Sequence, residues 1–185
     1  LRTSLLCSSN SFFTIVFRFC FSQQNYTFTN YTVNDGLAQS TVYSIIQDKR
    51  EFLWFATYGG GLCRFDGVKY KTYTTKDGLL DDKINALLED SKGNIWIGSR
   101  NGVNVYNGYT FDTIKLNNSS KQIQVRAIFE DSKNIIWIAT YGDGLFKIDG
   151  ENISNYTSYD GLTSNYIYSI EVVASNKILL GTKEG

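Results

Sequence analysis

Three pairs of neighbouring acidic residues are the most direct candidates for chemistry in this sequence. The pairs are Asp81 with Asp82, Glu89 with Asp90, and Glu130 with Asp131. Adjacent carboxyl groups can act as general acid and base, or bind calcium through their oxygens. The second and third pairs, however, open two nearly identical stretches, EDSKGNIWIGS and EDSKNIIWIAT. A pair repeated at one turn fits a structural role better, so we predict no catalytic residue and no metal site.

The sequence contains no histidine, which is the commonest general base and the commonest neutral metal ligand. Cys63 therefore has no imidazole to activate it, and we expect a buried structural thiol. Two glycine-rich stretches, YGGGL from Tyr58 and YGDGL from Tyr141, would suit a phosphate group only if a helix followed. No helix is indicated, so both are interpreted as hairpin loops. We expect a protein that is not an enzyme and that needs no cofactor.

Charge balance argues against a nucleic-acid partner. The 185 residues include 18 basic and 18 acidic side chains, and no basic face is evident. A hydrophobic content of 42% and an aromatic content of 15% exclude a disordered chain. We therefore expect a folded protein with a hydrophobic core.

The elements that position these residues come in repeats. Trp54 and Trp96 are 42 residues apart, Trp137 follows after 41, and a further 42 residues lead to Leu179. The tripeptide DGL also recurs, at 35–37, 77–79 and 160–162. The sequence therefore contains four registers of one unit.

Each unit predicts four short strands and no sustained helical pattern. In the second unit we expect strands at 83–89, 94–99, 103–106 and 109–114. In the turn between the first two strands, Asp90 should accept backbone N–H groups and Gly93 can take a positive φ. Asn107 and Gly108 indicate a tight hairpin between the last two strands.

The second strand of each unit is apolar on both faces, with Ile95 and Ile97 on one side and Trp96 on the other. A strand of this kind lies between two sheets. The residue two positions later is small, which lets the neighbouring sheet come close. These small residues are Ala56, Gly98, Ala139 and Gly181. We expect the tryptophans in the core, not on a ligand-stacking surface.

Four-stranded sheets at this period are typical of the blades of a β-propeller. We predict an all-β fold, a β-propeller of four-stranded antiparallel blades, over 26–185. It comprises an outer closing strand at 26–32, blades at 41–74, 83–114 and 123–157, and a half blade at 165–185. The propeller is expected to be incomplete, with three blades and parts of two others.

The stretch DGLLDDKINALLEDSKGNIWIGSRNGV, 77–103, resembles the two-component regulator propeller repeat. That repeat reads DGL, a strand, D-x-x-G-N-x-W-I-G-T and a glycine-rich turn. The resemblance extends from Tyr31 to the last residue in four registers. It departs from the pattern at NNSS near Asn118 in place of DGL, at 49–51 in place of the turn glycine, and at Leu179 in place of Trp.

The resemblance implies seven-bladed propellers that form the periplasmic sensor of membrane histidine kinases or hybrid kinase-regulators, many of which respond to oligosaccharides. On that basis we expect a ligand-sensing, extracytoplasmic and non-catalytic propeller of a two-component regulator, with an oligosaccharide as ligand. The remaining blades and a kinase would follow in a membrane-anchored full-length chain, for which a homodimer is a candidate assembly. Two alternatives stay open. One is a protein-interaction scaffold, and the other is a propeller lyase of cyclic antibiotics, which is expected to need a histidine and magnesium.

The first 22 residues differ in kind from the repeats. Arg2 precedes an apolar run at 12–21, which is too short to span a bilayer. Cys20 and Ser22 are small residues at the positions that a signal peptidase prefers. We predict a secretory signal peptide at 1–22 and export from the cytoplasm, with a short membrane anchor or mis-started upstream sequence as the alternatives. Cys63 would then be the one cysteine of the mature chain, which excludes a disulfide framework.

One position varies between the units while its neighbours do not. It directly follows the Thr or Ser that ends each second strand, and it is occupied by Tyr58, Arg100, Tyr141 and Lys183. Equivalent positions lie at the same edge of each blade, so these side chains should form an arc on one face. Tyrosine can stack on a sugar ring, and arginine or lysine can bind an acidic group. We predict a ligand-binding site here; the alternative is an exposed hairpin position that tolerates any residue, and the DGL loops are the next candidates.

Overall fold

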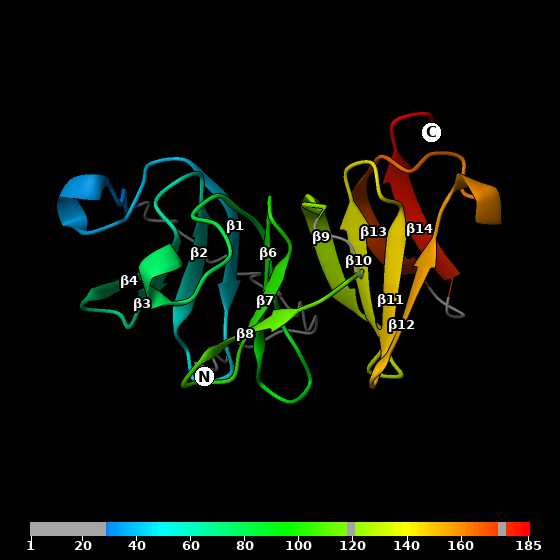
Figure 1. The fold of residues 1–185 in the computed structure, drawn as a ribbon. Coiled ribbons are helices and arrows are strands. Elements are labelled where there is room, and N and C mark those ends of the chain that lie inside the picture. Colours follow the sequence, from blue (N-terminus) through cyan, green and yellow to red (C-terminus); the bar gives the residue numbers. More distant parts are fainter. Residues whose placement is uncertain (1–28, 118–120, 174–176) are drawn as a thin grey trace, which may run out of the picture. The chain divides into compact units, whose positions relative to one another are not determined.

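The computed structural model describes residues 29–117, 121–173 and 177–185 (Figure 1). All the described strands belong to the second of two compact units, Tyr31–Gly185. The predicted signal peptide, 1–22, lies outside the described residues. Residues 29–32 contain no strand and 26–28 are not described, so the closing strand at 26–32 remains a prediction.

The described strands form three four-stranded antiparallel sheets and one two-stranded sheet, as expected for an all-β propeller (Figure 1). The first sheet contains β1 (Val42–Gln47), β2 (Leu53–Thr57), β3 (Leu62–Phe65) and β4 (Tyr70–Tyr73). The second contains β5 (Ile84–Glu89), β6 (Ile95–Ser99), β7 (Val103–Tyr106) and β8 (Phe111–Ile114). The third contains β9 (Val125–Glu130), β10 (Ile136–Thr140), β11 (Leu145–Asp149) and β12 (Asn152–Tyr156). The last contains β13 (Ile167–Val173) and β14 (Lys177–Thr182).

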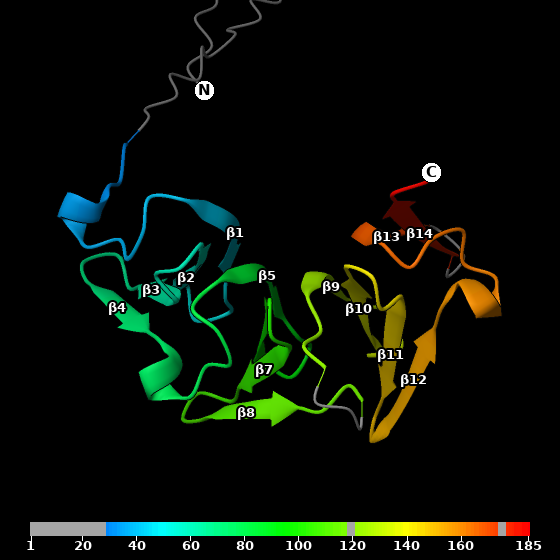
Figure 2. The same ribbon diagram turned by 45° about the horizontal axis from the view of Figure 1, so that its top comes forward.

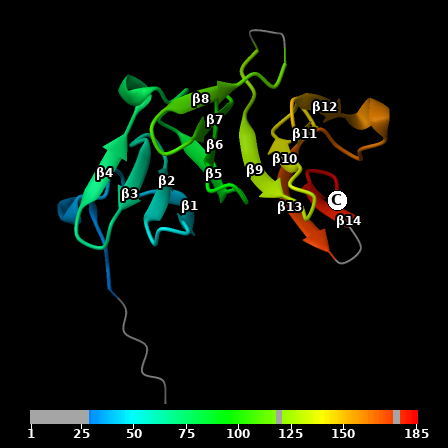
Figure 3. The same cartoon turned by 90° about the horizontal axis from the view of Figure 1, so that it is seen from below.

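Consecutive sheets are in contact through their first strands. The strands β1, β5, β9 and β13 lie next to one another in sequence order, whereas β4, β8 and β12 lie further apart (Figures 2 and 3). This is the arrangement of propeller blades around an axis. The described sheets do not close into a ring, which agrees with the prediction of an incomplete propeller.

Three short 3-10 helices were not predicted from the sequence. They are η1 (Val33–Asp35), η2 (Thr75–Asp77) and η3 (Ser158–Asp160), and each one ends at a DGL motif. In η2 the Asp77 carboxylate accepts from the backbone and hydroxyl of Thr74, and Gly78 takes a φ of 108°. Such turns are too short to give a helical pattern in the sequence. Among the described residues, no helix has the length and apolar character needed to cross a membrane.

The second strand of the middle sheet, β6, is buried on both faces, as predicted, whereas β14 of the last sheet is not, and its Leu179 is 56% exposed. Ile95 and Ile97 of β6 pack with Trp54 of the first sheet, whereas Trp96 packs with residues of the third sheet such as Val125. Trp54 is fully buried and Trp96 is 8% exposed. A Cβ atom at Gly98 would lie 2.5 Å from Val125 Cγ1, so a small residue is needed there for the sheets to approach. The predicted core position is confirmed for Trp54 and Trp96, whereas Trp137 is only half-buried.

A hydrogen bond from each tryptophan to an aspartate was not predicted from the sequence. The indole Nε1 atoms of Trp54, Trp96 and Trp137 donate to Oδ2 of Asp48, Asp90 and Asp131 at 2.8, 2.9 and 3.0 Å. The other oxygen, Asp90 Oδ1, accepts from the backbone of Lys92 and Asn94, as expected for this turn. Burial alone would raise the pKa of Asp90, but hydrogen bonds from Trp96 and Asn94 outweigh it and hold the pKa below its usual value.

The third position after each of these aspartates has a left-handed backbone. Gly93 has a φ of 84°, as predicted, but Glu51 and Asn134 adopt φ values of 69° and 61° at the same place. A glutamate in this region is strained, because its Cβ approaches the backbone. The first unit therefore keeps the turn geometry without the glycine that suits it.

The glutamates of the acidic pairs connect one sheet to the previous one. The Glu89 carboxylate accepts from the Lys49 backbone N–H at 3.0 Å, and Glu130 accepts from the backbone and hydroxyl of Ser91 at 2.6 and 2.7 Å. Asp90 and its equivalents hold their own turns, as described above. Both members of the second and third acidic pairs thus have a structural role.

The glycine-rich loops also connect neighbouring sheets. The backbone N–H groups of Gly59 and Gly61 donate to the Asp82 carbonyl at 3.0 and 2.9 Å. A Cβ at Gly61 would lie 2.1 Å from the Tyr73 carbonyl oxygen. The N–H groups of this loop therefore donate to a protein carbonyl, as expected for a hairpin loop and not for a phosphate-binding loop. Cys63 is buried and free, as expected.

Candidate ligand-binding site

The four predicted site residues occupy equivalent backbone positions. Each directly follows a second strand, and each donates its backbone N–H to a carbonyl just before or at the start of the first strand in the same sheet. The bonds are Tyr58 to Thr41 at 3.0 Å, Arg100 to Lys83 at 3.3 Å, Tyr141 to Gln124 at 2.8 Å and Lys183 to Tyr166 at 3.0 Å. The backbone is therefore held in the same way in each sheet, whereas the side chains differ and are exposed.

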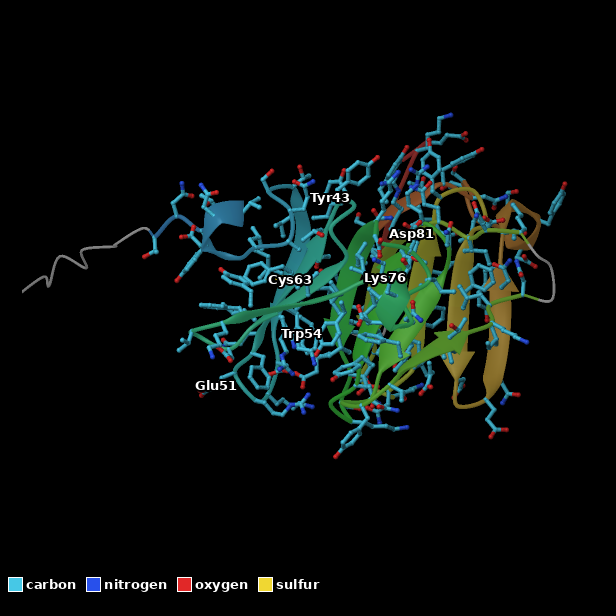
Figure 4. All side chains as sticks on the ribbon, turned by 60° about the vertical axis from the view of Figure 1, so that its left-hand side comes forward. Tyr43, Glu51, Trp54, Cys63, Lys76 and Asp81 are labelled. Atoms are coloured by element: carbon cyan, nitrogen blue, oxygen red, sulfur yellow. The ribbon has the colours of Figure 1, made fainter. Side chains whose placement is uncertain are left out.

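Three of the four predicted residues line one hollow of about 300 Å³, which we call the arginine hollow. Its lining residues are Tyr43, Tyr58, Asn85, Arg100, Gln124, Arg126 and Tyr141. They come from three consecutive sheets. We call the turns between the first and second strands, at Asp48, Asp90 and Asp131, the aspartate turns. Tyr43 lies near one end of the first sheet and Glu51 at the other, so the arginine hollow and the aspartate turns are at opposite ends of the sheets (Figure 4).

Lys183 does not line the arginine hollow. Its ammonium group lies 5.3 Å from the centre of the Tyr166 ring. Tyr166 lines a second hollow of about 460 Å³, together with Arg100, Gln124 and Tyr141, which also line the first. We call this the lysine hollow, because Lys83 and Lys121 also line it.

Aromatic rings and cations alternate along this face. Tyr43 and Tyr58 meet edge to face with centroids 5.4 Å apart, and Lys83 Nζ lies 5.3 Å from the Tyr58 ring. The Arg126 guanidinium lies 4.9 Å from the Tyr141 ring. Tyr58 and Tyr141 remain 40% and 38% exposed. Their rings are thus oriented by neighbours and still accessible to a ligand.

The arginine hollow is electropositive. It is lined by two guanidinium groups and by no carboxylate. In the lysine hollow, Lys121 forms an ion pair with Asp143, and Asp81 accepts from the Lys83 backbone N–H at 2.9 Å. The cations of the first hollow therefore have no acidic counterpart within it.

Several lining residues were missed by the sequence analysis. One equivalent position of the first strands supplies Tyr43, Asn85 and Arg126 to the lining, and the fourth unit has Tyr168 there. The position two residues earlier supplies Lys83, Gln124 and Tyr166, and the first unit has Thr41 there. Both positions vary between units, as the predicted site does. The same comparison of aligned units would have found them.

The DGL loops are less suited to bind a ligand through their aspartates. The Asp35 carboxylate accepts from the backbone and hydroxyl of Thr32 at 2.7 and 2.8 Å, and Asp77 and Asp160 are used in the same way. The hydrogen bonds from the Thr32 backbone and hydroxyl lower the pKa of Asp35. These carboxylates are already engaged in capping.

A family model described as two component regulator propeller matches the chain at 36–59, 78–101 and 119–142. These segments are two component regulator propeller repeats. Each runs from a DGL glycine, or the equivalent position, to the residue after Tyr58, Arg100 or Tyr141. The propeller repeat therefore includes the predicted site position in each copy.

The solved structures that the chain resembles include two extracellular domains. The chain is 29% identical to the extracellular domain of BT3049 from B. thetaiotaomicron, a protein assigned as a hybrid two component system, with a TM-score of 0.72 over 80% of this chain and 20% of that one. It is 23% identical to the extracellular domain of BT4673 from the same organism, which has the same assignment, with a TM-score of 0.67 over 76% of this chain and 22% of that one. The chain thus spans only about a fifth of the length of either protein. No curated protein sequence matches the chain.

A streptogramin B lyase has the same fold. It is 19% identical, with a TM-score of 0.64 over 79% of this chain and 49% of the lyase. At this identity the likeness shows the propeller fold alone.

Proposed function

We propose that the chain is the ligand-sensing, extracytoplasmic propeller of a two-component signal transduction regulator, and that it has no catalytic activity of its own. The propeller repeats and the likeness to the extracellular domain of BT3049 support this role. The observation that carries the proposal is the arginine hollow. It gathers three variable residues from three successive sheets while the rest of each sheet repeats.

The ligand that suits this hollow best is an oligosaccharide. Tyrosine rings can stack on the apolar face of a sugar, and the amides of Asn85 and Gln124 can exchange hydrogen bonds with its hydroxyl groups. A volume of about 300 Å³ is at the lower end for a small-molecule site. The adjoining lysine hollow, which shares Arg100 and Tyr141, extends the surface for a longer ligand.

The remaining parts of the signalling protein belong to the same proposal. Further blades, a membrane anchor and a histidine kinase would complete the full-length chain, which is a candidate homodimer. Export would depend on the signal peptide at 1–22. The signal peptide is tested by mass spectrometry of the mature protein. We expect cleavage after Ser22, and an intact N-terminus would contradict the prediction.

The alternatives have less support from this face. A scaffold for protein binding should present an apolar patch there, whereas the arginine hollow is lined by tyrosines, amides and guanidinium groups. A lyase of the antibiotic-cleaving kind is expected to need a histidine, and these 185 residues contain none.

Two alanine variants test the site. Tyr58→Ala and Arg100→Ala should each weaken oligosaccharide binding about tenfold, because each removes one main contact. Binding would be found on a glycan array and then measured by surface plasmon resonance, and the melting temperature should not fall. Tyr109→Ala is the matched control, since Tyr109 is 93% exposed in the hairpin between β7 and β8 at the opposite end of its sheet. Unchanged affinity in both site variants would refute the site.

A further inference from the structure

The arginine hollow combines two arginines from neighbouring sheets. Arg100 directly follows β6 of the second sheet, and Arg126 lies in β9 of the third. The two sheets are joined beside the hollow by the Asn85 side-chain amide, which donates to the Val125 carbonyl at 2.8 Å. The distance between the arginine backbones is therefore set by the packing of the sheets and not by a loop.

Neither guanidinium has an acidic partner among the described residues. The ion pairs found there involve Arg50, Lys121 and Lys147. The Arg126 Nε atom is buried and has no hydrogen-bond partner. This covered Nε atom is out of a ligand's reach, so an anion in the hollow would be bound by the terminal N–H groups of Arg126.

The orientation of Arg126 is fixed in advance. Its guanidinium carbon lies 4.9 Å from the centre of the Tyr141 ring, and this cation–π contact restricts the movement of the side chain. A guanidinium held in this way loses little freedom when it forms a two-pronged hydrogen bond with a carboxylate or sulfate. Arg100 has no such ring contact and is exposed, so it can adjust to the ligand.

We infer that the arginine hollow binds the anionic group of an acidic oligosaccharide, a carboxylate or a sulfate, between Arg100 and Arg126. This inference rests on the proposed sensor function and specifies its ligand class. The tyrosines Tyr43 and Tyr58 at the other side of the hollow are then placed to contact the sugar ring that carries the anion. A neutral oligosaccharide offers these guanidinium groups only hydroxyl and ether oxygens, which form weaker hydrogen bonds than a charged acceptor does.

Binding at this place links two sheets. An anion held by Arg100 and Arg126 adds a contact across the interface that Asn85 already bridges. The second and third sheets should therefore separate less readily in the bound state. Hydrogen exchange at the β5 and β9 backbones should slow down when an acidic ligand is present.

The first experiment compares oligosaccharides that differ only in charge. The full chain is immobilised sparsely for surface plasmon resonance, and uronate-containing and sulfated oligosaccharides from a glycan array are each paired with a neutral counterpart. The acidic member of a pair should bind at least about tenfold more tightly. Arg100→Gln and Arg126→Gln should each lower that affinity about tenfold and lower the affinity for the neutral counterpart by less.

The control variant is Lys92→Gln, which removes a positive charge from an exposed residue of the aspartate turn. It should leave the affinity unchanged. An equal loss in Lys92→Gln would mean that acidic sugars are attracted by overall charge, and would overturn the inference. Neutral oligosaccharides that bind as well as acidic ones would also overturn it, while leaving the sensor proposal intact.

A second experiment tests the anion site without an oligosaccharide. The side-chain resonances of ¹⁵N-labelled arginine are followed while glucuronate, inorganic sulfate or glucose is added to the full chain. The Arg100 and Arg126 resonances, identified with the two glutamine variants, should shift saturably with the two anions and not with glucose. Absence of such shifts would refute the anion site. If the shifts occur and no oligosaccharide binds, the anion site stands and the oligosaccharide sensor does not.

Discussion

The two ends of the sheets use the same strands in opposite ways. At one end, the turns that join the first and second strands are stabilised by side chains. Asp90 accepts hydrogen bonds from the Trp96 indole and from the backbone of its own turn, and Glu89 accepts one from the previous sheet. At the other end, Arg100 and its equivalents are held by backbone hydrogen bonds. Figure 4 shows these ends through Glu51 and Tyr43. Side chains that stabilise the turns recur from unit to unit. Side chains at positions that are held by backbone hydrogen bonds can differ between units.

The largest effect is expected at the aspartate turn. Asp90→Ala removes the acceptor of the buried Trp96 indole bond and of two half-buried backbone N–H bonds. We expect a loss of about 3 kcal/mol in the free energy of unfolding. Arg100→Ala, at the other end of the same second strand, should change it by less than about 0.5 kcal/mol.

Denaturant unfolding of the two variants measures this difference. Similar losses in both would show that the hollow end also carries the fold, and the contrast between the two ends would be lost.

A smaller effect of the same turn should appear in acid. The pKa of Asp90 and of Asp131 is lowered in the folded protein, where burial, which would raise it, is outweighed by hydrogen bonds led by that from the tryptophan. A lowered pKa stabilises the folded state above the unfolded pKa of about 3.9, and this contribution is lost as the pH falls through the folded value. The wild-type melting temperature should therefore fall more steeply below about pH 4 than that of Asp90→Asn. Parallel curves for the two proteins would contradict it.

Much of this fold could be predicted from the sequence, because periodicity reports packing directly. The strands expected at 83–89 and 94–99 are β5 (Ile84–Glu89) and β6 (Ile95–Ser99). The last strand, expected from 109, begins at Phe111, because Asn107 accepts from the backbone of Tyr109 and Thr110 and extends the turn. Local alternation of residues contains this information.

The candidate site was less predictable, because it depends on distances between sheets. Arg126 and Tyr43 belong to first strands, and only the packing of three sheets brings them beside Arg100. Lys183 occupies the predicted position but lies beyond this hollow, against Tyr166. Equivalent positions in a repeat are predicted to lie at the same edge of each sheet. The repeat alone does not predict which of these side chains line the same hollow.

A modest gain in stability should follow from correcting the strained turn. Glu51 has a φ of 69°, where Gly93 of the next unit has 84°. Glu51→Gly should stabilise the protein by about 0.5–1 kcal/mol, because relief of the left-handed strain exceeds the extra chain entropy of glycine in the unfolded state. Gly93→Ala should destabilise it by a similar amount for the opposite reason. Thermal unfolding measures both, and a loss in Glu51→Gly would mean that its side chain contributes to the turn.

The smallest effect on stability, and the clearest effect on function, is expected from an exchange within the hollow. The double variant Tyr58→Arg with Arg100→Tyr keeps composition and net charge and only reverses the order of two side chains. Both positions are exposed and both backbones are held by their own N–H bonds, to Thr41 and Lys83, so the melting temperature should change by less than about 2 °C. The guanidinium would then stand between Tyr43 and Lys83 and no longer share the hollow's other side with Arg126. Affinity for acidic oligosaccharides should fall while the protein stays folded. A large drop in melting temperature would show that the variable position is structural, and unchanged affinity would show that the order of side chains around the hollow does not select the ligand.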